Sequence, residues 1–189
     1  MKKLLAIVIV MLMAGTAFAD VNFDLIKTIQ QNPQKLTVKR VESLLKRGAD
    51  INYQDDTGIS ILMHALIQNV NTDVLMFMID SGADVKAHDS FGVTVLMYAC
   101  IGQTNTAPSV VRRILEEGAN VNDQNDDGQS AIMFIAANIG NNKAHEIAKI
   151  LIEYGAYIDE IDKEGQTVFS YVKEGDDEMR EILSEAPKG

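Results

Sequence analysis

A ten-residue spacing between two glycines recurs four times in this chain of 189 residues. Each copy begins with a Gly-Ala pair and ends at a second glycine, and the copies span residues 48–58, 82–92, 118–128 and 155–165. The leading glycines are 34, 36 and 37 residues apart, whereas the inner spacing of ten never changes. A period this short corresponds to one supersecondary unit stacked against copies of itself, so it constrains the whole fold.

An apolar triplet at helical spacing precedes each Gly-Ala pair. Apolar residues at i, i+3 and i+4 form one stripe along an α-helix. The glycine that follows can adopt the left-handed conformation that ends a helix. The triplets are Val41, Leu44 and Leu45; Leu75, Met78 and Ile79; Val111, Ile114 and Leu115; and Ala148, Leu151 and Ile152.

Another helix is predicted directly after the second glycine of each copy. There a hydroxyl residue precedes an apolar run, and its side chain can accept a hydrogen bond from an unpaired backbone N–H of the first turn. The four predicted N-cap residues are Ser60, Thr94, Ser130 and Thr167. The unit is therefore expected to contain two helices and a short finger of polar turn residues.

This unit resembles the ankyrin repeat, whose pattern is a Gly-x-Thr-Pro-Leu-His opening, a second helix ending in Leu-Leu, and then Gly-Ala-Asp-Val-Asn. The resemblance covers about residues 20–185. It implies an all-α solenoid of stacked helix pairs with short β-turn fingers, about five repeats including degenerate caps. Met63, Met97, Met133 and Ser170 replace the family's histidine, so apolar packing is expected to join the repeats.

The resemblance also predicts where each repeat begins. We expect an N-terminal capping repeat at 20–54, full repeats at 55–88, 89–124 and 125–161, and a C-terminal capping repeat at 162–189. The residues in excess of the family's 33-residue period fall between the two helices, around 69–72, 102–108 and 140–143. Fingers are thus constant in length, while the loops between helices vary.

The first nineteen residues have the features of a secretory signal peptide rather than of a structural helix. Lys2 and Lys3 precede an apolar run, and residues 17–19 (Ala-Phe-Ala) fit a small-x-small cleavage site. The run is short for a membrane span, and no stop-transfer charges follow it. We expect cleavage after Ala19 and a periplasmic or secreted protein. An uncleaved anchor is the alternative.

The mature chain is strongly acidic. Without Lys2 and Lys3 it has 15 basic and 27 acidic residues, a net charge of −12. Nucleic acids and anionic lipids bind through Lys and Arg, so neither is an expected partner. The charge favours another protein with a basic surface. Alternatively, the acidic residues simply keep an extended monomer soluble.

The residues most often used in catalysis do not form a recognisable constellation. Cys100 is the only cysteine and is expected to be buried and unreactive. His64, His88 and His145 fall at three different positions of the repeat, so stacking does not gather them into a zinc site or a catalytic triad. No enzymatic activity and no cofactor are expected.

A partial match to a calcium-binding loop lies in the third finger. Asp123, Asn125, Asp127 and Gly128 match the opening of such a loop. The twelfth position requires a bidentate Glu but holds Phe134, so we reject the calcium site. Asp and Asn in this finger are better explained by turn formation.

The ankyrin resemblance implies a protein-binding surface made of the finger tips and the outward side of the first helices. Carried onto this chain, its contact residues are Gln54, Asp56, Thr57 and Ile59; His88, Ser90, Phe91 and Val93; and Gln124, Asp126, Asp127 and Gln129. Ile59, Phe91 and Val93 are expected to form a central apolar anchor within an acidic rim, the usual anatomy of a protein-binding patch. Alternatively, Phe91 packs back onto its own finger as core.

The sequence thus predicts a non-enzymatic module that inhibits, sequesters or scaffolds a partner protein, and neutralisation of a toxin in the periplasm is one such role. The alternative is an accessory protein of an exported enzyme or of an oxidative-stress response, with a bound small molecule such as haem. Because a fold does not fix a function, this ranking rests on the resemblance and on the absence of a catalytic constellation.

Overall fold

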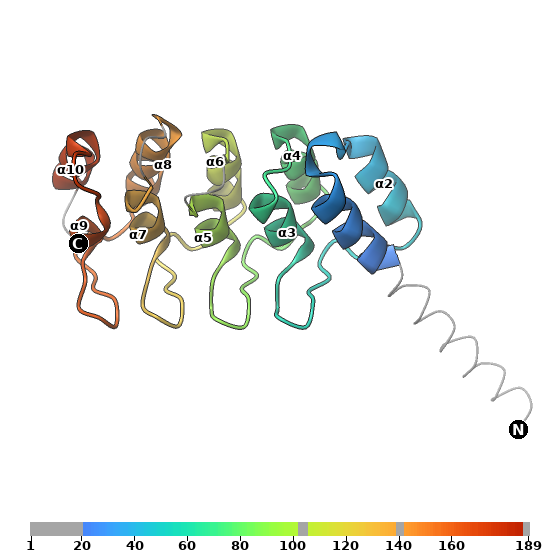
Figure 1. The fold of residues 1–189 in the computed structure, drawn as a ribbon, viewed down its shortest axis with the longest axis horizontal. Coiled ribbons are helices and arrows are strands. Elements are labelled where there is room, and N and C mark those ends of the chain that lie inside the picture. Colours follow the sequence, from blue (N-terminus) through green and yellow to red (C-terminus); the bar gives the residue numbers. More distant parts are fainter. Residues whose placement is uncertain (1–20, 102–105, 139–141, 187–189) are drawn as a thin grey trace, which may run out of the picture.

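The computed structural model describes residues 21–101, 106–138 and 142–186. The predicted signal peptide lies outside these ranges. Helix pairs stack in one row, with α3, α5, α7 and α9 in one layer and α4, α6, α8 and α10 in the other (Figure 1). The elements are a helical segment at 21–31, the 3₁₀ turn η1 (Pro33–Lys35), α2 (Val38–Lys46), α3 (Ile61–Ile67), α4 (Thr72–Asp80), α5 (Val95–Cys100), α6 (Pro108–Glu116), α7 (Ala131–Ala136), α8 (Asn142–Glu153), α9 (Val168–Tyr171) and α10 (Asp177–Ser184).

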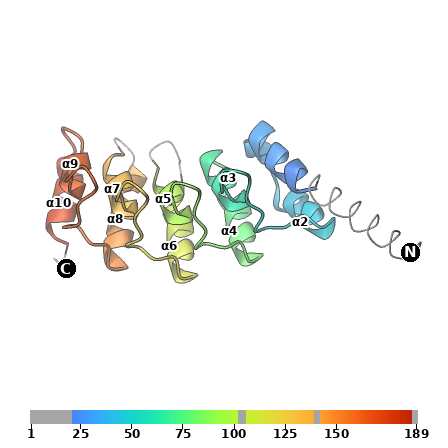
Figure 2. The ribbon, with the colours of Figure 1, turned by 90° about the horizontal axis from the view of Figure 1, so that it is seen from below.

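Packing runs from each repeat to the next along the row. Helix α5 contacts α3 and α7 in its own layer, and α6 contacts α4 and α8 in the other. Figure 2 shows the same single row from below. Met63, Met97 and Met133 lie in the core with at most 1% of their surface exposed, so the predicted apolar packing between repeats is confirmed. The sequence-based fold, an all-α solenoid of helix pairs, is also confirmed.

Isolated β-bridges close the fingers at their base. The bridges join Gln54 to Ser60, His88 to Thr94, Gln124 to Ser130 and Ile161 to Thr167. Each pairs one residue on either side of the finger, and within the described residues they do not extend into a sheet. The fingers project from the helix layers along the lower edge of the row (Figure 1).

Close contact with the next finger explains why the second glycine of a copy is glycine. Gly92 has φ of 73°, and a Cβ added there would lie 3.2 Å from the backbone nitrogen of Asp126 in the next finger. At Gly58, with φ of 79°, a Cβ would lie 2.9 Å from the nitrogen of Ser90. Each position thus requires both a left-handed backbone and the absence of a side chain, which only glycine supplies.

The four predicted N-cap residues differ in how they pair the backbone N–H groups of the first helical turn. Ser60 and Thr94 accept a hydrogen bond through their side chains, as predicted. The prediction was wrong for Ser130 and Thr167, whose side chains make no capping bond. In α7 the N–H of Met133 donates to the carbonyl of Ser130 at 3.0 Å instead. A tight first turn therefore pairs the same backbone donor without using the hydroxyl.

Two asparagines join consecutive repeats below the outer helices. The side chain of Asn52 donates to the carbonyl of Gly82 at 3.1 Å and accepts from the N–H of Asp84 at 2.8 Å. Asn122 makes the same pair of bonds to Gly155 and Tyr157 two repeats later. These bonds fix the spacing between repeats along this edge.

Lys86 interrupts this series, because it occupies the position of Asn52 and Asn122 in the repeat between them. Its side chain instead passes beside Gly118. We expect Lys86→Asn to restore both bonds and to raise the free energy of unfolding by about 1–2 kcal/mol. Urea denaturation would measure the gain, with Asn52→Ala as the opposite control. A variant no more stable than the parent would contradict the inferred equivalence.

Candidate protein-binding site at the fingers

An aspartate or asparagine shapes each finger. In the second finger, Asp89 Oδ1 accepts hydrogen bonds from the backbone N–H of Phe91 at 2.8 Å and of Val93 at 2.9 Å. Asp55, Asn125 and Asp162 accept the corresponding bonds from the residues two and four positions later. These are Asx turns, in which a side-chain oxygen replaces the backbone acceptor and closes the loop. The conformation of each finger is thus fixed by its first residue.

The second carboxylate oxygen ties three of these fingers to the first helix of their own repeat. Asp89 Oδ2 accepts from the hydroxyl of Tyr98 at 2.7 Å. Asp162 Oδ2 pairs with the hydroxyl of Tyr171, and Asp55 Oδ2 lies 2.9 Å from His64 Nε2. In each pair the partner follows nine residues after the aspartate.

The third finger differs at both positions of this pair. Asn125 takes the place of the aspartate, and nine residues later Phe134 takes the place of the tyrosine or histidine. A buried carboxylate needs hydrogen bonds, and phenylalanine cannot donate one. The amide of Asn125 donates instead to Gln129 within the finger, at 3.2 Å. The two positions therefore change together, as expected if they form one structural unit.

The protonation states follow from these contacts. Burial, the bond to Asp89 and its negative charge raise the pKa of Tyr98, so this phenol stays neutral and remains a donor. The pKa of Asp162 is lowered mainly by the bond from Tyr171. For Asp55, partial burial opposes ionisation, but bonds from Thr57 and His64 lower the pKa overall. Asp55 and Asp162 are therefore ionised at neutral pH.

Backbone hydrogen bonds connect the finger tips into a continuous row. The N–H of Ser90 donates to the backbone carbonyl of Thr57 at 3.0 Å, and the N–H of Asp126 donates to that of Phe91 at 2.9 Å. The N–H of Lys163 donates to the backbone carbonyl of Asp127, also at 2.9 Å. The tips consequently form one rigid edge, although they come from four separate repeats.

The twelve contact residues predicted from the sequence all lie on three adjacent fingers. Nine are exposed and three are half-buried, the half-buried ones being Ile59, Val93 and Gln129. Phe91 is 67% exposed, so the alternative that it packs back as core is wrong. Ile59 and Val93 pack against the core, because their N–H groups are held by the finger aspartates. The expected apolar trio is therefore reduced to one prominent aromatic side chain.

Three of the predicted contact residues are glutamines whose side chains are engaged within the protein. Gln54 donates to the carbonyls of Gly58 and His88. Gln124 donates to Glu160, and Gln129 donates to Tyr171. Gln54 and Gln124 thus join their fingers to the next finger, and Gln129 joins the third finger to α9 (Val168–Tyr171).

Exposed apolar side chains that the sequence analysis did not assign to binding gather at the C-terminal end. Tyr157, Ile161 and Phe169 are 46%, 59% and 36% exposed. Ile161 occupies the finger-base position held by Gln54, His88 and Gln124, so comparison of the repeats could have found it. Phe169 is equivalent to buried residues in other repeats, and within the described residues no further repeat packs against it.

The groups examined for metal or catalytic chemistry remain apart. His64 lies on α3, His88 on a finger and His145 on α8. The described residues hold no group of three or more His, Cys, Asp or Glu side chains that could bind a metal ion. Cys100 is fully buried, and burial raises the pKa of its thiol to about 12, so it is not nucleophilic at neutral pH.

A known protein family matches this architecture. A family model of ankyrin repeats, in three copies, matches residues 34–109 and 103–188. The chain belongs to the ankyrin-repeat family. No match was found among curated proteins. Ankyrin repeats are generally protein–protein interaction modules and are typically non-enzymatic binding scaffolds.

The described helices of this ankyrin-repeat chain are short. A membrane-spanning helix needs about 20 predominantly apolar residues. Over residues 21–101, 106–138 and 142–186, no helix has that combination of length and apolarity.

Proposed function

We propose that this ankyrin-repeat protein is an exported, non-enzymatic module that binds one partner protein through its row of finger tips. By binding, it inhibits, sequesters or scaffolds that partner, and neutralisation of a toxin is one form of such inhibition. The family supports protein binding in general. The choice of surface and the location of the protein are our proposal.

One observation carries the choice of surface: an aromatic residue with a hydrogen-bonded backbone and an exposed side chain lies near the centre of the row. Phe91 is 67% exposed, while its N–H is bonded to Asp89 and its carbonyl to Asp126. An anchor whose backbone is already fixed loses little conformational entropy on binding. Large aromatic side chains near the centre of an interface often supply most of the binding energy.

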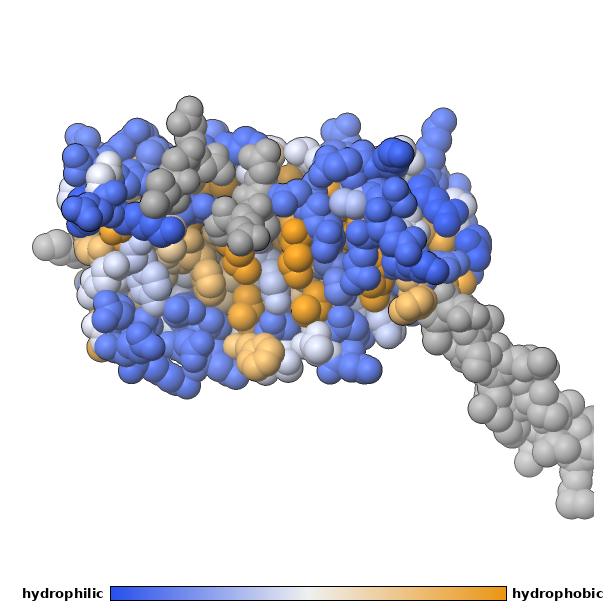
Figure 3. Space-filling model, in the orientation of Figure 1, coloured by the Kyte–Doolittle hydropathy of each residue, from blue (hydrophilic) through white to orange (hydrophobic). Residues whose placement is uncertain are grey.

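The charges around this anchor indicate the partner's chemistry. Asp56, Asp126 and Asp127 are exposed on the same row of fingers. In Figure 3, hydrophilic residues cover most of the lower margin where the fingers lie, a hydrophobic group interrupts this margin near its middle, and further hydrophobic residues form a band above it. An acidic rim attracts a basic surface and accelerates the encounter. We therefore propose a partner with a basic patch around an apolar pocket.

Phe91→Ala tests this assignment. The partner would first be captured from a periplasmic extract with the mature protein and identified. We expect the substitution to weaken binding of that partner by about 2 kcal/mol or more, while the thermal midpoint stays nearly unchanged because the side chain is mostly in solvent. Calorimetric titration and thermal unfolding would measure the two quantities.

Phe23→Ala is the matched control, because Phe23 is 63% exposed but lies on the N-terminal helical segment. It should leave binding unchanged. Reversal of both Asp126 and Asp127 to Lys should instead slow association by about tenfold and reduce its dependence on salt. Normal binding by Phe91→Ala, or equal losses in both phenylalanine variants, would exclude the finger tips as the binding surface.

Export rests on the sequence of the first nineteen residues and has its own test. Expression of the full chain in a Gram-negative host should yield a soluble periplasmic protein that begins at Asp20. Fractionation followed by mass spectrometry of the intact protein would determine the N-terminus and the compartment. An intact Met1 terminus, or recovery with membranes, would disprove cleavage and export.

A further inference from the structure

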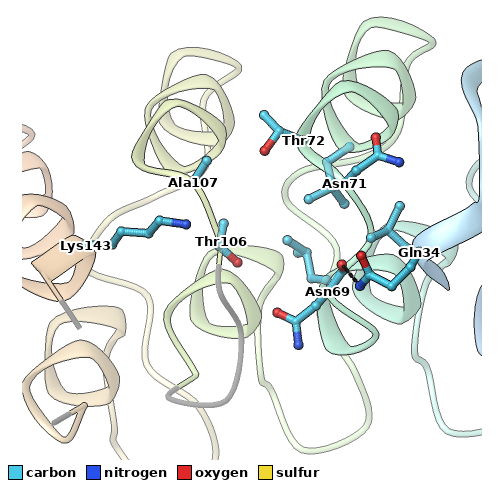
Figure 4. Close-up of a pocket in the computed structure, with 10 residues that line it drawn as sticks. Gln34, Asn69, Asn71, Thr72, Thr106, Ala107 and Lys143 are labelled. Atoms are coloured by element: carbon cyan, nitrogen blue, oxygen red, sulfur yellow. Dashed lines mark hydrogen bonds between the residues drawn. The ribbon is translucent and has the colours of Figure 1, made fainter. Parts of the chain in front are cut away.

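A polar pocket lies at the edge of the array where the two helices of each repeat are joined. It has a volume of about 270 Å³ and is lined by Gln34, Leu66, Asn69, Val70, Asn71, Thr72, Leu75, Thr106, Ala107 and Lys143 (Figure 4). Its polar lining comes largely from the segments that exceed the 33-residue period of the family. This volume corresponds to about nine water molecules, enough for a small organic ion.

Thr106 gives the pocket an unusual feature. The residue is 4% exposed, and its Oγ1 is buried without a hydrogen-bond partner among the described residues. Burying a hydroxyl in this way is unfavourable and is rare in folded proteins. Both Thr106 and Lys143 line the pocket, and in Figure 4 the side chain of Lys143 extends toward Thr106, whose hydroxyl is turned toward the side where Asn69 and Gln34 lie. A ligand that accepts a hydrogen bond would satisfy it.

The charge of the side chains that line the pocket determines whether the pocket favours an anion or a cation. Lys143 is the charged side chain among the described residues that line the pocket, and no carboxylate is among them. Ala107, which also lines it, is the N-cap of α6 and provides no side-chain cap. The start of this nine-residue helix carries partial positive charge, although Pro108 has no N–H and the N–H groups of Val110 and Val111 already donate to the carbonyl of Ala107. A cationic pocket in a chain of net charge −10 is a local exception.

The opposite wall is held in a fixed shape. Asn69 is the one non-glycine residue with positive φ in the described part of the chain, at 53°. Its carbonyl accepts a bond from the side chain of Gln34 at 3.0 Å, and the side chain of Asn71 donates to the carbonyl of Leu36 at 2.9 Å. Asn69 ends α3 in the left-handed conformation common at helix ends, with its N–H bonded to the carbonyl of Leu66 and the N–H of Val70 bonded to that of Ala65. These bonds hold this wall of the pocket in one conformation.

We propose that this pocket binds a small anion through a carboxylate or phosphate group, which accepts a hydrogen bond from the Thr106 hydroxyl and pairs with the Lys143 ammonium. The rest of the ligand lies against the wall formed by Asn69 and Asn71. This site is on a different edge of the array from the finger tips and does not depend on the proposed partner.

Isothermal titration of the mature protein with inorganic phosphate, succinate and citrate would test the site, with sodium chloride at equal ionic strength as the reference. We expect saturable binding of at least one of these anions with one site per chain. Preference for phosphate or for the carboxylates distinguishes the two ligand sources. Absence of saturable binding by all three would overturn the proposal.

Two variants locate the binding. Lys143→Met should weaken it at least tenfold, whereas Lys149→Met, an exposed lysine on the same helix α8 that does not line this pocket, should leave it unchanged. Equal losses in both variants, or no loss in Lys143→Met, would show nonspecific attraction to surface charge and contradict the site.

Thr106→Val distinguishes a hydroxyl that binds the anion from one that has only a structural role. Removing the unpaired hydroxyl should raise the thermal midpoint of the anion-free protein by roughly 2–4 °C, while anion affinity falls several-fold. Opposite effects on stability and binding from one atom would identify Thr106 as a ligand-binding group. Unchanged affinity in this variant would remove it from the site and refute the stated contact.

Discussion

Replacing Leu96 by alanine is expected to lower the free energy of unfolding by about 2–5 kcal/mol, the range for a large-to-small substitution in a core. Leu96 is 1% exposed on α5, in the middle of the array, where α5 contacts α3, α6 and α7. Because each repeat is stabilised by its neighbours, a cavity here weakens both interfaces of the central repeat. Chemical denaturation of the mature protein would measure the loss.

The matched control is Asp126→Ala on a finger tip. Asp126 is exposed, and its contact with the preceding finger uses the backbone N–H, which alanine retains. We expect a change below about half a kcal/mol. If Asp126→Ala were the more destabilising of the two, the assignment of core and finger positions would be wrong.

The fold could be predicted from the sequence because its determinants are local and repeated. Left-handed glycines, apolar triplets and finger length recur at one register, so each copy supports the assignment of the others. Thr167 and Ser130 were mispredicted as side-chain caps because a hydroxyl residue can also begin a helix through its own carbonyl. Sequence alone does not distinguish the two, since both place the same residue before the same turn.

The candidate site could be predicted only in part. The fingers and the exposed Phe91 follow from the register, but the inward packing of Ile59 and Val93 depends on side-chain bonds from Asp55 and Asp89. Ile161 was missed because contact positions were taken from the family pattern rather than compared between repeats.

The polar pocket depends on residues far apart in the sequence. Gln34, Asn69, Thr106 and Lys143 meet only when three repeats and the N-terminal cap are stacked. The sequence locates the variable loops from which three of them come, but it gives no distance between those loops. Neither the unpaired Thr106 hydroxyl nor its proximity to Lys143 could therefore be foreseen.

Asp89→Ala is expected to destabilise the protein by about 3–5 kcal/mol and to abolish binding through Phe91. The substitution removes three hydrogen bonds to one carboxylate: from the N–H of Phe91, the N–H of Val93 and the hydroxyl of Tyr98. Bonds to a charged acceptor contribute about 1.5–3 kcal/mol each, and the two backbone donors can recover part of this from water. The finger that presents Phe91 would lose its fixed conformation.

A double variant tests whether the finger conformation depends on the Asx turn or on the bond between the Asp89 carboxylate and Tyr98. Asp89→Asn combined with Tyr98→Phe reproduces the pair Asn125 and Phe134 that the third repeat already contains. The asparagine oxygen still accepts the two backbone bonds, as it does in that repeat. In the third repeat the asparagine amide donates to Gln129, whereas Val93 holds the equivalent position here and cannot accept, so the double variant leaves this amide without that partner. We therefore expect the double variant to lose about 1–3 kcal/mol, less than Asp89→Ala, and to retain partner binding, because the Asx turn is kept. Urea denaturation of the parent, Asp89→Ala and the double variant would measure this. Equal destabilisation in both variants would mean that the tyrosine tie, rather than the Asx turn, holds the finger, and that the third repeat is stabilised in some other way.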